Sequence, residues 1–395
     1  MRPLLHALLP RPPHPTRDGG AIRAYFLLRA LSDEFRVRAF VLRSSSRRSD
    51  GDYPPEIQVR EIPHVGRAPR RALAVARSLA GGAAYSELLY RSRRLSRELR
   101  QALSRERPEW VVAFFYHLGG LAVRQEAPSW IDFQNVDSQI WARVARTSTS
   151  PFARWFARGQ TPRVQALERR LLSTARGVSC VSVLDAGALS AMSPGARPLV
   201  VPNGVDLSRY RFRADPRPDK LLFFVGDLSW PPEAEGIRWF RAEVWPLLKR
   251  HHPDARVEVL GRGAPADLRR LSEPDFCLLG EGGDTRPYWE RAAVAVVPLR
   301  AGGGTRLKIL EAAACGVPAV STPVGAEGLE LAPGAEIAIG ADAVSFAEET
   351  ARLLSDPEAR RRQAAAARRR IESVYDWTPI GAAFAAELSR RSSTA

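Results

Sequence analysis

Short apolar runs alternate along the chain with longer segments in which apolar positions recur every three or four residues. This alternation predicts strands connected by helical crossovers, and therefore an α/β fold with parallel sheets. Because 395 residues exceed what one ordinary hydrophobic core holds, we expect two domains. The expected strands are residues 4–9, 37–42, 57–62, 110–115, 130–133, 178–181, 199–201, 221–225, 256–260, 276–279 and 294–299.

The boundary between the domains is expected near 201–206, where Asn203-Gly204 supplies a tight turn. Residues 211–219 contain two prolines and charges of alternating sign, which is typical of a hinge. The last 40 residues have a helical pattern. The expected division is an N-terminal domain at 1–202, a C-terminal domain at 203–375, and a helix at 376–395 that crosses back to the first domain.

A glycine loop between a buried strand and a helix is the strongest candidate site. Backbone N–H groups and the helix dipole at such a junction favour an anion. Cations in the first turn oppose the dipole unless a phosphate lies between them. This pattern predicts a phosphosugar or nucleotide site, and the alternative is an ordinary turn with a solvated basic patch. The residues concerned are Gly302, Gly303, Gly304, Thr305, Arg306, Leu307, Lys308 and, further along the helix, Glu311.

The segments GGGTRLKILEAAACGVPAVST at 302–322 and GAEGLE at 325–330 resemble the donor-binding signature of family 4 retaining glycosyltransferases. DGG at 18–20, VPNGVD at 201–206 and FVGDLSWPPEAEGIRWF at 224–240 occur in the same order as in that family. The resemblance runs from about residue 4 to 378 and includes members of the exopolysaccharide type. It implies the GT-B fold, in which two Rossmann-like domains face a cleft.

The resemblance also implies an activity, namely retaining transfer of a sugar from a nucleotide-diphosphate sugar to a lipid-linked or polysaccharide acceptor. Arg306 and Lys308 would stabilise the leaving diphosphate, and Glu311 would accept from the ribose hydroxyls. No resident cofactor is expected, and no metal, because no carboxylate pair of the DxD kind follows a strand. The donor would carry UDP or GDP. Further donor contacts are expected in loops after strands, at Gly19, Gly20, Gly226, Arg262 and Gly282.

Two positions depart from the family pattern. Many members have two glutamates with seven residues between them, whereas the position that precedes Glu311 by this spacing is Gly303. The Arg/Lys pair that often follows the strand before Gly226 is also missing. The donor sugar therefore stays open, and a nucleotide-sugar-binding protein with reduced catalysis is a second hypothesis. A NAD-dependent enzyme is disfavoured, because no G-x-G-x-x-G follows the first strand.

His117 follows the strand 110–115, and ligands of open parallel sheets bind beyond the carboxyl ends of strands. This place suits contact with the acceptor or the transferred sugar, although a lone histidine is more often structural. The strand 130–133 leads to a helical segment, and Asp137 or Ser138 is expected to cap that helix.

Charge is distributed unevenly along the chain. Residues 1–200 hold 32 arginines and 16 acidic residues, whereas 27 basic and 27 acidic residues balance in the remainder. Such a field concentrates polyanions or anionic lipid head groups. Arginines crowd the helical stretch 67–107, and aromatic residues mix with arginines at 151–164. These segments suit either a membrane surface or a solvated face. Nucleic-acid binding is not expected, because no recognition motif is present.

Cys180, Cys277 and Cys315 are widely spaced in apolar segments, which indicates reduced core residues rather than a disulfide framework or a zinc site. No apolar run approaches the length that spans a bilayer, and the first 15 residues lack the apolar core of a signal peptide. We therefore expect a cytoplasmic protein. A peripheral position on the inner face of the membrane is the alternative that the basic first half raises.

Overall fold

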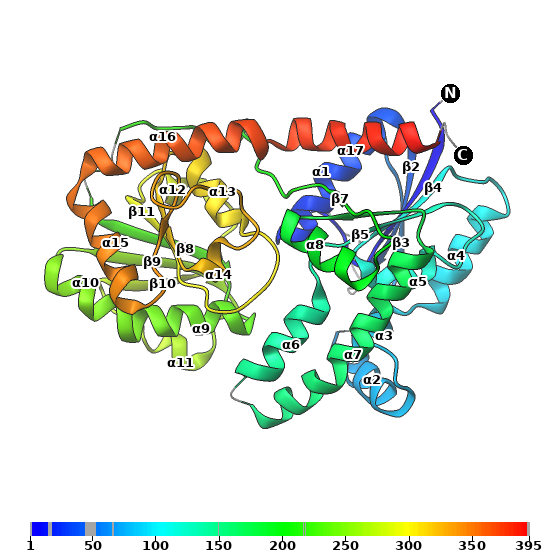
Figure 1. Ribbon diagram of the computed structural model, residues 1–395, viewed down its shortest axis with the longest axis horizontal. Helices are drawn as coiled ribbons and strands as arrows, with labels where there is room; N and C mark the ends of the chain where they lie inside the picture. Colours follow the sequence, from blue (N-terminus) through cyan, green and yellow to red (C-terminus); the bar gives the residue numbers. More distant parts are fainter. Residues whose placement is uncertain are drawn as a thin grey trace. The chain divides into compact units, whose positions relative to one another are not determined.

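The computed structural model describes residues 2–14, 18–43, 53–64, 67–148, 150–215, 217 and 219–392, so parts of the first glycine loop and of the expected hinge lie outside the described residues. The chain divides into two compact units (Figure 1). The first unit comprises residues 1–202 and 378–395, and the second comprises residues 203–377.

The first unit contains a seven-stranded sheet in the order β3-β2-β1-β4-β5-β6-β7, and every strand pair is parallel. The interior strand β1 places Leu5 between Val37 of β2 and Trp110 of β4. Each connection is a crossover, as parallel pairing requires. The strands are β1 Leu4–Leu9, β2 Arg36–Arg43, β3 Gln58–Pro63, β4 Trp110–Phe114, β5 Ser129–Asp132, β6 Gly177–Cys180 and β7 Leu199–Val200.

Helices connect these strands, and α6 and α7 run side by side (Figure 1). The basic stretch 67–107 is three helices rather than one. The chain breaks at Gly82, whose φ is 70°, and again at Ser92, which caps the third helix. The elements are α1 Gly19–Glu34, α2 Arg67–Gly81, α3 Tyr85–Tyr90, α4 Arg93–Leu103, the 3-10 turn η1 Tyr116–Leu118, α5 Gly119–Ala122, α6 Asp137–Thr147, α7 Pro151–Thr174, α8 Val183–Met192 and α17 Trp377–Ser392.

A buried ion pair fixes α1 against the sheet of the first unit. Arg23 donates to both carboxylate oxygens of Asp132, at 2.7 and 2.9 Å, and to the carbonyl of Val201 at 2.7 Å. The C-terminal helix α17 packs on the same unit, since the indole nitrogen of Trp110 donates to the carbonyl of Leu388. The Arg23–Asp132 pair holds α1 and β5 in one geometry, because separating the two side chains would leave a buried charge without solvent or a partner.

The second unit contains a six-stranded parallel sheet in the order β10-β9-β8-β11-β12-β13. Phe223 and Phe224 of β8 belong to different hydrophobic clusters, so both faces of this sheet are buried. The strands are β8 Leu221–Asp227, β9 Arg256–Arg262, β10 Phe276–Gly280, β11 Val294–Val297, β12 Ala319–Ser321 and β13 Ala338–Ile339. The helices are α9 Pro231–Trp239, the π-turn η2 Phe240–Val244, α10 Trp245–His251, α11 Ala266–Arg269, α12 Arg286–Trp289, α13 Leu307–Ala314, α14 Pro323–Ala326, α15 Ala343–Ser355 and α16 Pro357–Val374.

The α/β fold class with two parallel-sheet domains is confirmed, and two local predictions are wrong. Neither Asp137 nor Ser138 caps α6. Asp137 accepts from the hydroxyl of Tyr116 at 2.8 Å, and Glu168 of α7 accepts from the backbone N–H of Ser138. Cys277 is partly exposed rather than part of the core, because β10 is an edge strand. Within the described ranges, no helix is long and apolar enough to cross a membrane.

Candidate functional site

The glycine loop between β11 and α13 has a backbone that only glycine adopts without strain. Gly302 has a φ of 131° and Gly304 a φ of 70°, both outside the region that side chains favour. A Cβ on Gly302 would lie 2.6 Å from the guanidinium of Arg306 and 2.8 Å from the ring of Trp230. The amide of Asn203 donates to the hydroxyl of Thr305 at 2.8 Å and holds the end of the loop.

The helix α13 begins after this loop without a side-chain cap. Its first turn, which starts at Leu307, therefore offers backbone N–H groups and the positive end of the helix dipole to a ligand. Arg306 occupies the N-cap position and is buried. Its guanidinium turns back onto its own loop and donates to the carbonyls of Gly303 and Gly304. In this state Arg306 braces the loop that would surround an anion.

Lys308 forms a buried ion pair that the sequence did not reveal. Its ammonium nitrogen lies 2.8 Å from Oε1 of Glu233 and 4.0 Å from the centre of the Phe224 ring. The side chains of Lys308 and Glu233 are 8% and 10% exposed. Burial lowers the pKa of Lys308, and the ion pair with Glu233 opposes that shift. The pair therefore favours the charged form of the ammonium, which lies beside Gly226.

Gly226 leaves the space that this pair occupies. A Cβ at Gly226 would come 1.6 Å from Oε2 of Glu233 and 2.9 Å from the ammonium nitrogen of Lys308. Oε2 of Glu233 is buried and has no hydrogen-bond partner in the part of the chain that the structure describes. A buried carboxylate oxygen without a partner loses its hydration, so it is a strong acceptor for a ligand hydroxyl.

Glu311 lies further along α13 and is already hydrogen-bonded. One of its oxygens accepts from the indole nitrogen of Trp289 at 3.1 Å and from the hydroxyl of Thr285 at 3.2 Å. Burial raises the pKa of Glu311, and the hydrogen bonds from Trp289 and Thr285 oppose the shift. These bonds orient one oxygen, and the carboxylate remains next to the loop after β10.

Two other expected donor contacts are engaged differently. Arg262 ends β9 and pairs with Asp227 at the end of β8, with Nη2 2.7 Å and Nε 3.0 Å from one carboxylate oxygen. This pair would have to loosen before Arg262 could contact a phosphate. Gly282 lies in the loop after β10, where a Cβ would come 2.7 Å from Leu260. Its role here is close packing against β9.

Gly19, Gly20 and His117 belong to the first unit, whereas the other expected site residues belong to the second. Gly19 and Gly20 open α1, and a Cβ on Gly20 would lie 2.3 Å from the ring of Phe115. Phe115 itself has a φ of 75°, a strained conformation that directs the chain into η1.

His117 lies at the carboxyl end of β4, as the sequence predicts. Its Nε2 is 3.7 Å from a carboxylate oxygen of Asp137, and its ring packs against Tyr90 and Tyr116. Its Nδ1 is buried and makes no hydrogen bond to a described residue. Burial, with a further contribution from Asp137, raises the pKa of the neighbouring Tyr116 well above its usual range. A histidine, a carboxylate and a tyrosine hydroxyl therefore lie together just beyond the carboxyl end of β4.

Residues 219–356 match the family described as "Glycosyl transferases group 1", so the second unit carries a domain of that kind. Over 267 residues the chain is 28% identical to a glycogen synthase of Mycobacterium tuberculosis, which covers 64% of this chain. The chain spans 63% of the length of that relative. It is also 24% identical over 136 residues to an uncharacterized 44.6 kDa protein of the cps region of Klebsiella pneumoniae, covering 32% of this chain and 35% of that protein.

Solved structures of the GT-B kind share the fold. Sucrose-phosphate synthase from Thermosynechococcus elongatus superposes with a TM-score of 0.78 at 16% identity, and both chains are covered completely. Anabaena Alr3699/HepE, in complex with UDP and glucose, gives a TM-score of 0.68 at 14% identity, with 98% of this chain and 100% of that chain covered. At these identities the likeness establishes the two-domain fold.

Proposed function

We propose that this protein transfers a sugar from a nucleotide-diphosphate sugar to a glycan or lipid-linked acceptor. One observation carries the proposal, namely a buried ammonium in the first turn of a helix that has no side-chain cap and follows a glycine loop with positive φ. Lys308 and the N–H groups of α13 offer positive charge to one point, which is the arrangement that stabilises a leaving diphosphate. The match of residues 219–356 to glycosyltransferases supports the same conclusion.

The donor would bind along α13 and its loop. The diphosphate lies against the loop amides and Lys308, and the ribose hydroxyls reach the carboxylate of Glu311. We propose UDP as the nucleotide, because structural relatives are known in complex with UDP or UDP-glucose. Charge that develops on the leaving phosphate is stabilised by groups that are already in place, which lowers the barrier without further reorganisation.

Glu233 is proposed to hold the donor sugar. The family glutamate expected eight positions before Glu311 is Gly303 in this chain, so another acceptor must bind the sugar hydroxyls. Oε2 of Glu233 is buried, lacks a partner among the described residues, and lies over Gly226. Oε1 accepts from the ammonium of Lys308, so Oε2 is the oxygen that would accept from a sugar hydroxyl.

Metal independence and retention of configuration complete the proposed mechanism. Arg306 and Lys308 supply the positive charge that a divalent cation supplies in other transferases. With no nucleophilic carboxylate assigned, the acceptor oxygen would attack from the face that the diphosphate leaves, and the leaving phosphate would accept its proton. His117 is proposed to contact the acceptor or the transferred sugar.

A peripheral position on an anionic membrane is proposed for the first unit, which we place in the cytoplasm. Phe152 and Trp155 at the start of α7 are 63% and 56% exposed, and Arg154 and Arg158 are their neighbours. Exposed aromatic residues among arginines suit a head-group interface. We expect the protein to pellet with phosphatidylglycerol vesicles at low salt. A double change of Phe152 and Trp155 to serine should weaken this binding, and unchanged binding would contradict the membrane role.

Calorimetry with UDP, followed by assays of UDP-sugar hydrolysis and transfer, tests the proposed function. Binding with turnover supports a transferase. Binding without hydrolysis or transfer would favour the second candidate, a nucleotide-sugar-binding protein, for which Gly303 in place of a glutamate is the specific indication. Absence of binding to UDP and to GDP would contradict both.

A further inference from the structure

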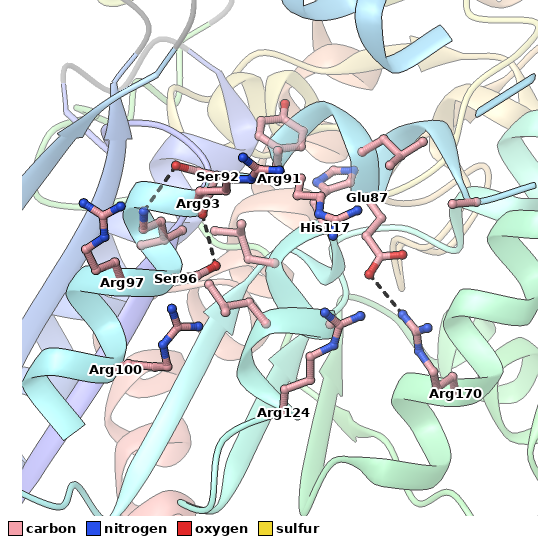
Figure 2. Close-up of a pocket in the computed structure, with 17 residues that line it drawn as sticks. Glu87, Arg91, Ser92, Arg93, Ser96, Arg97, Arg100, His117, Arg124 and Arg170 are labelled. Atoms are coloured by element: carbon pink, nitrogen blue, oxygen red, sulfur yellow. Dashed lines mark hydrogen bonds and ion pairs between the residues drawn. The ribbon is translucent and has the colours of Figure 1, made fainter. Parts of the chain in front are cut away.

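A hollow in the first unit has six arginines among its 17 lining residues. Its volume is about 570 Å³, which is within the range of small-molecule sites. Its walls come from α3, from the segment between α3 and α4, from α4, from η1 and α5, and from α7 (Figure 2). The charged residues that line it are Arg91, Arg93, Arg97, Arg100, Arg124, Arg170 and Glu87. His117, which belongs to η1, also lines the hollow.

Most of these arginines have no acidic counterpart. Arg170 pairs with Glu87 at 3.1 Å. For the other five, no carboxylate of the described chain lies within the 4.0 Å of an ion pair. Positively charged guanidinium groups around a concave surface repel one another and concentrate a positive potential inside it. The feature therefore favours a ligand that brings negative charge.

An arginine-rich hollow in the second unit shows the contrast. There Arg361 and Arg362 pair with Glu358 at 2.9 and 3.7 Å, and Arg352 pairs with Glu349 at 2.7 Å. The arginines of that hollow are thus largely neutralised by neighbouring carboxylates. The same side-chain type is balanced in one unit and left unbalanced in the other, so arginine-rich composition alone does not account for the hollow in the first unit.

We propose that the hollow in the first unit binds the phosphate group of a small phosphorylated ligand. Guanidinium groups match phosphate oxygens with two parallel hydrogen bonds. Arg100 of α4 and Arg124 after α5 both line the hollow, and they come from different elements (Figure 2). Leucines in the lining offer apolar contact to the rest of the ligand.

The role of this ligand as the sugar acceptor rests on the proposed function, whereas phosphate binding does not. His117 joins the hollow to the carboxyl end of β4, where its Nδ1 is buried without a partner among described residues. A ligand whose phosphate lies among the arginines would place its other end toward this histidine. The phosphate can belong to a soluble phosphate ester or to a lipid phosphate, and both present the same chemistry to the arginines.

Calorimetry on the full chain with glycerol 3-phosphate tests the proposal, with glycerol as the uncharged control and UDP present throughout. The variant Arg100→Gln/Arg124→Gln should bind glycerol 3-phosphate about tenfold or more weakly, as expected for lost hydrogen bonds to a charged group. The control is Arg94→Gln/Arg105→Gln. Arg94 lies in α4 and Arg105 just after it, and both are exposed but do not line the hollow. This control variant should bind within about twofold of the unchanged protein, because only the long-range field is reduced.

A second arm uses phosphatidylcholine vesicles with and without phosphatidate, which carries the same phosphate ester on a lipid. Selective loss of vesicle binding in Arg100→Gln/Arg124→Gln assigns the site to a lipid phosphate, and selective loss of glycerol 3-phosphate binding assigns it to a soluble ester. The proposal is overturned if neither probe binds, or if both double variants lose binding equally. UDP affinity is measured separately and reports on the donor site. Loss of UDP binding would contradict the proposed function, whereas loss of glycerol 3-phosphate or phosphatidate binding would contradict only the phosphate site.

Discussion

Replacement of Glu233 by glutamine is expected to change how UDP binding depends on pH. The substitution keeps the shape of the side chain but removes the negative charge that lies 2.8 Å from the ammonium of Lys308. Two unit charges at this distance attract by about 6 kcal/mol at an effective dielectric constant of about 20. Desolvation offsets part of this attraction, and the remaining hydrogen bond retains another part. We expect a net loss of about 2–4 kcal/mol in the free energy of unfolding at neutral pH.

The sign of the effect follows from the pKa of Lys308. Burial already lowers that pKa from its ordinary value of 10.5, and Glu233 opposes the shift. Without the carboxylate the pKa falls further, so Lys308 loses its charge at a lower pH. Because the diphosphate of UDP binds the charged ammonium, the pH at which UDP affinity declines should move downward in Glu233→Gln. Between the lowered pKa and 10.5 the unfolded chain binds more protons, so the stability of the variant should rise with pH.

Calorimetric UDP titrations from pH 6 to 10 measure this shift. Glu235→Gln is the matched control, because Glu235 is in the same helix, is about half exposed, and pairs with Arg300 at 3.2 Å. Its pH profile should coincide with that of the unchanged protein. Coincident profiles for Glu233→Gln and the unchanged protein would refute the idea that Glu233 maintains the charge of Lys308.

Three further predictions concern the donor site and one buried acid. Lys308→Ala should weaken UDP binding by about 1.5–3 kcal/mol, as measured by calorimetry, because a charged hydrogen bond to phosphate is lost. Transfer activity should survive EDTA, whereas complete loss that Mg²⁺ or Mn²⁺ restores would contradict the proposed role of Arg306 and Lys308. Glu168 has its pKa raised to about 7 by burial, so the folded state binds more protons between 4.5 and 7 and stability should fall as pH rises through this window. Denaturant unfolding should show the free energy of unfolding falling by up to about 3 kcal/mol across this pH window. The variant Glu168→Gln should not show this decrease.

The centres of the two sheets could be predicted from the sequence because strands such as β1, β4 and β11 are buried at every position. Runs such as Trp110–Phe114 and Val294–Val297 are apolar at every position, and a helical pattern separates them from the next strand. The fold class follows from this alternation, together with the rule that parallel strands need crossovers. The strand order did not follow, since it depends on which side of β1 and β8 each crossover returns.

The glycine loop was also predictable, whereas the contacts around it were not. Glycines followed by cations at a helix start are a local pattern, and Arg306 and Lys308 lie where the pattern places them. Glu233 is 75 positions from Lys308, and in the sequence it resembles an ordinary acidic residue in the first turn of α9. The two meet because β8 and β11 are neighbours in the sheet. The available signal was Gly226, a glycine at a strand end whose missing Cβ leaves space for a side chain.

The capping prediction for α6 failed for a related reason. Asp137 and Ser138 have the right chemistry to cap a helix, but long-range partners compete for them. The hydroxyl of Tyr116 donates to Asp137, and Glu168 takes the N–H of Ser138. Tertiary contacts thereby moved the start of the helix to Asp137 itself. A local preference worth about 1 kcal/mol yields to two hydrogen bonds to carboxylates, one of them buried and the other partly buried.

The donor site at Lys308 and the arginine hollow differ in how far nearby carboxylates balance their positive charge. This difference predicts that binding at the two sites depends differently on ionic strength. In the second unit Lys308 is compensated internally by Glu233, within a buried pair that salt screens weakly. In the first unit the arginines of the hollow are exposed, and five of them lack a carboxylate partner in the described chain, so their field is fully open to screening. UDP affinity should therefore fall less steeply with ionic strength than glycerol 3-phosphate affinity. Equal slopes would mean that both ligands bind through the same exposed cations, which would contradict the assignment of two distinct sites.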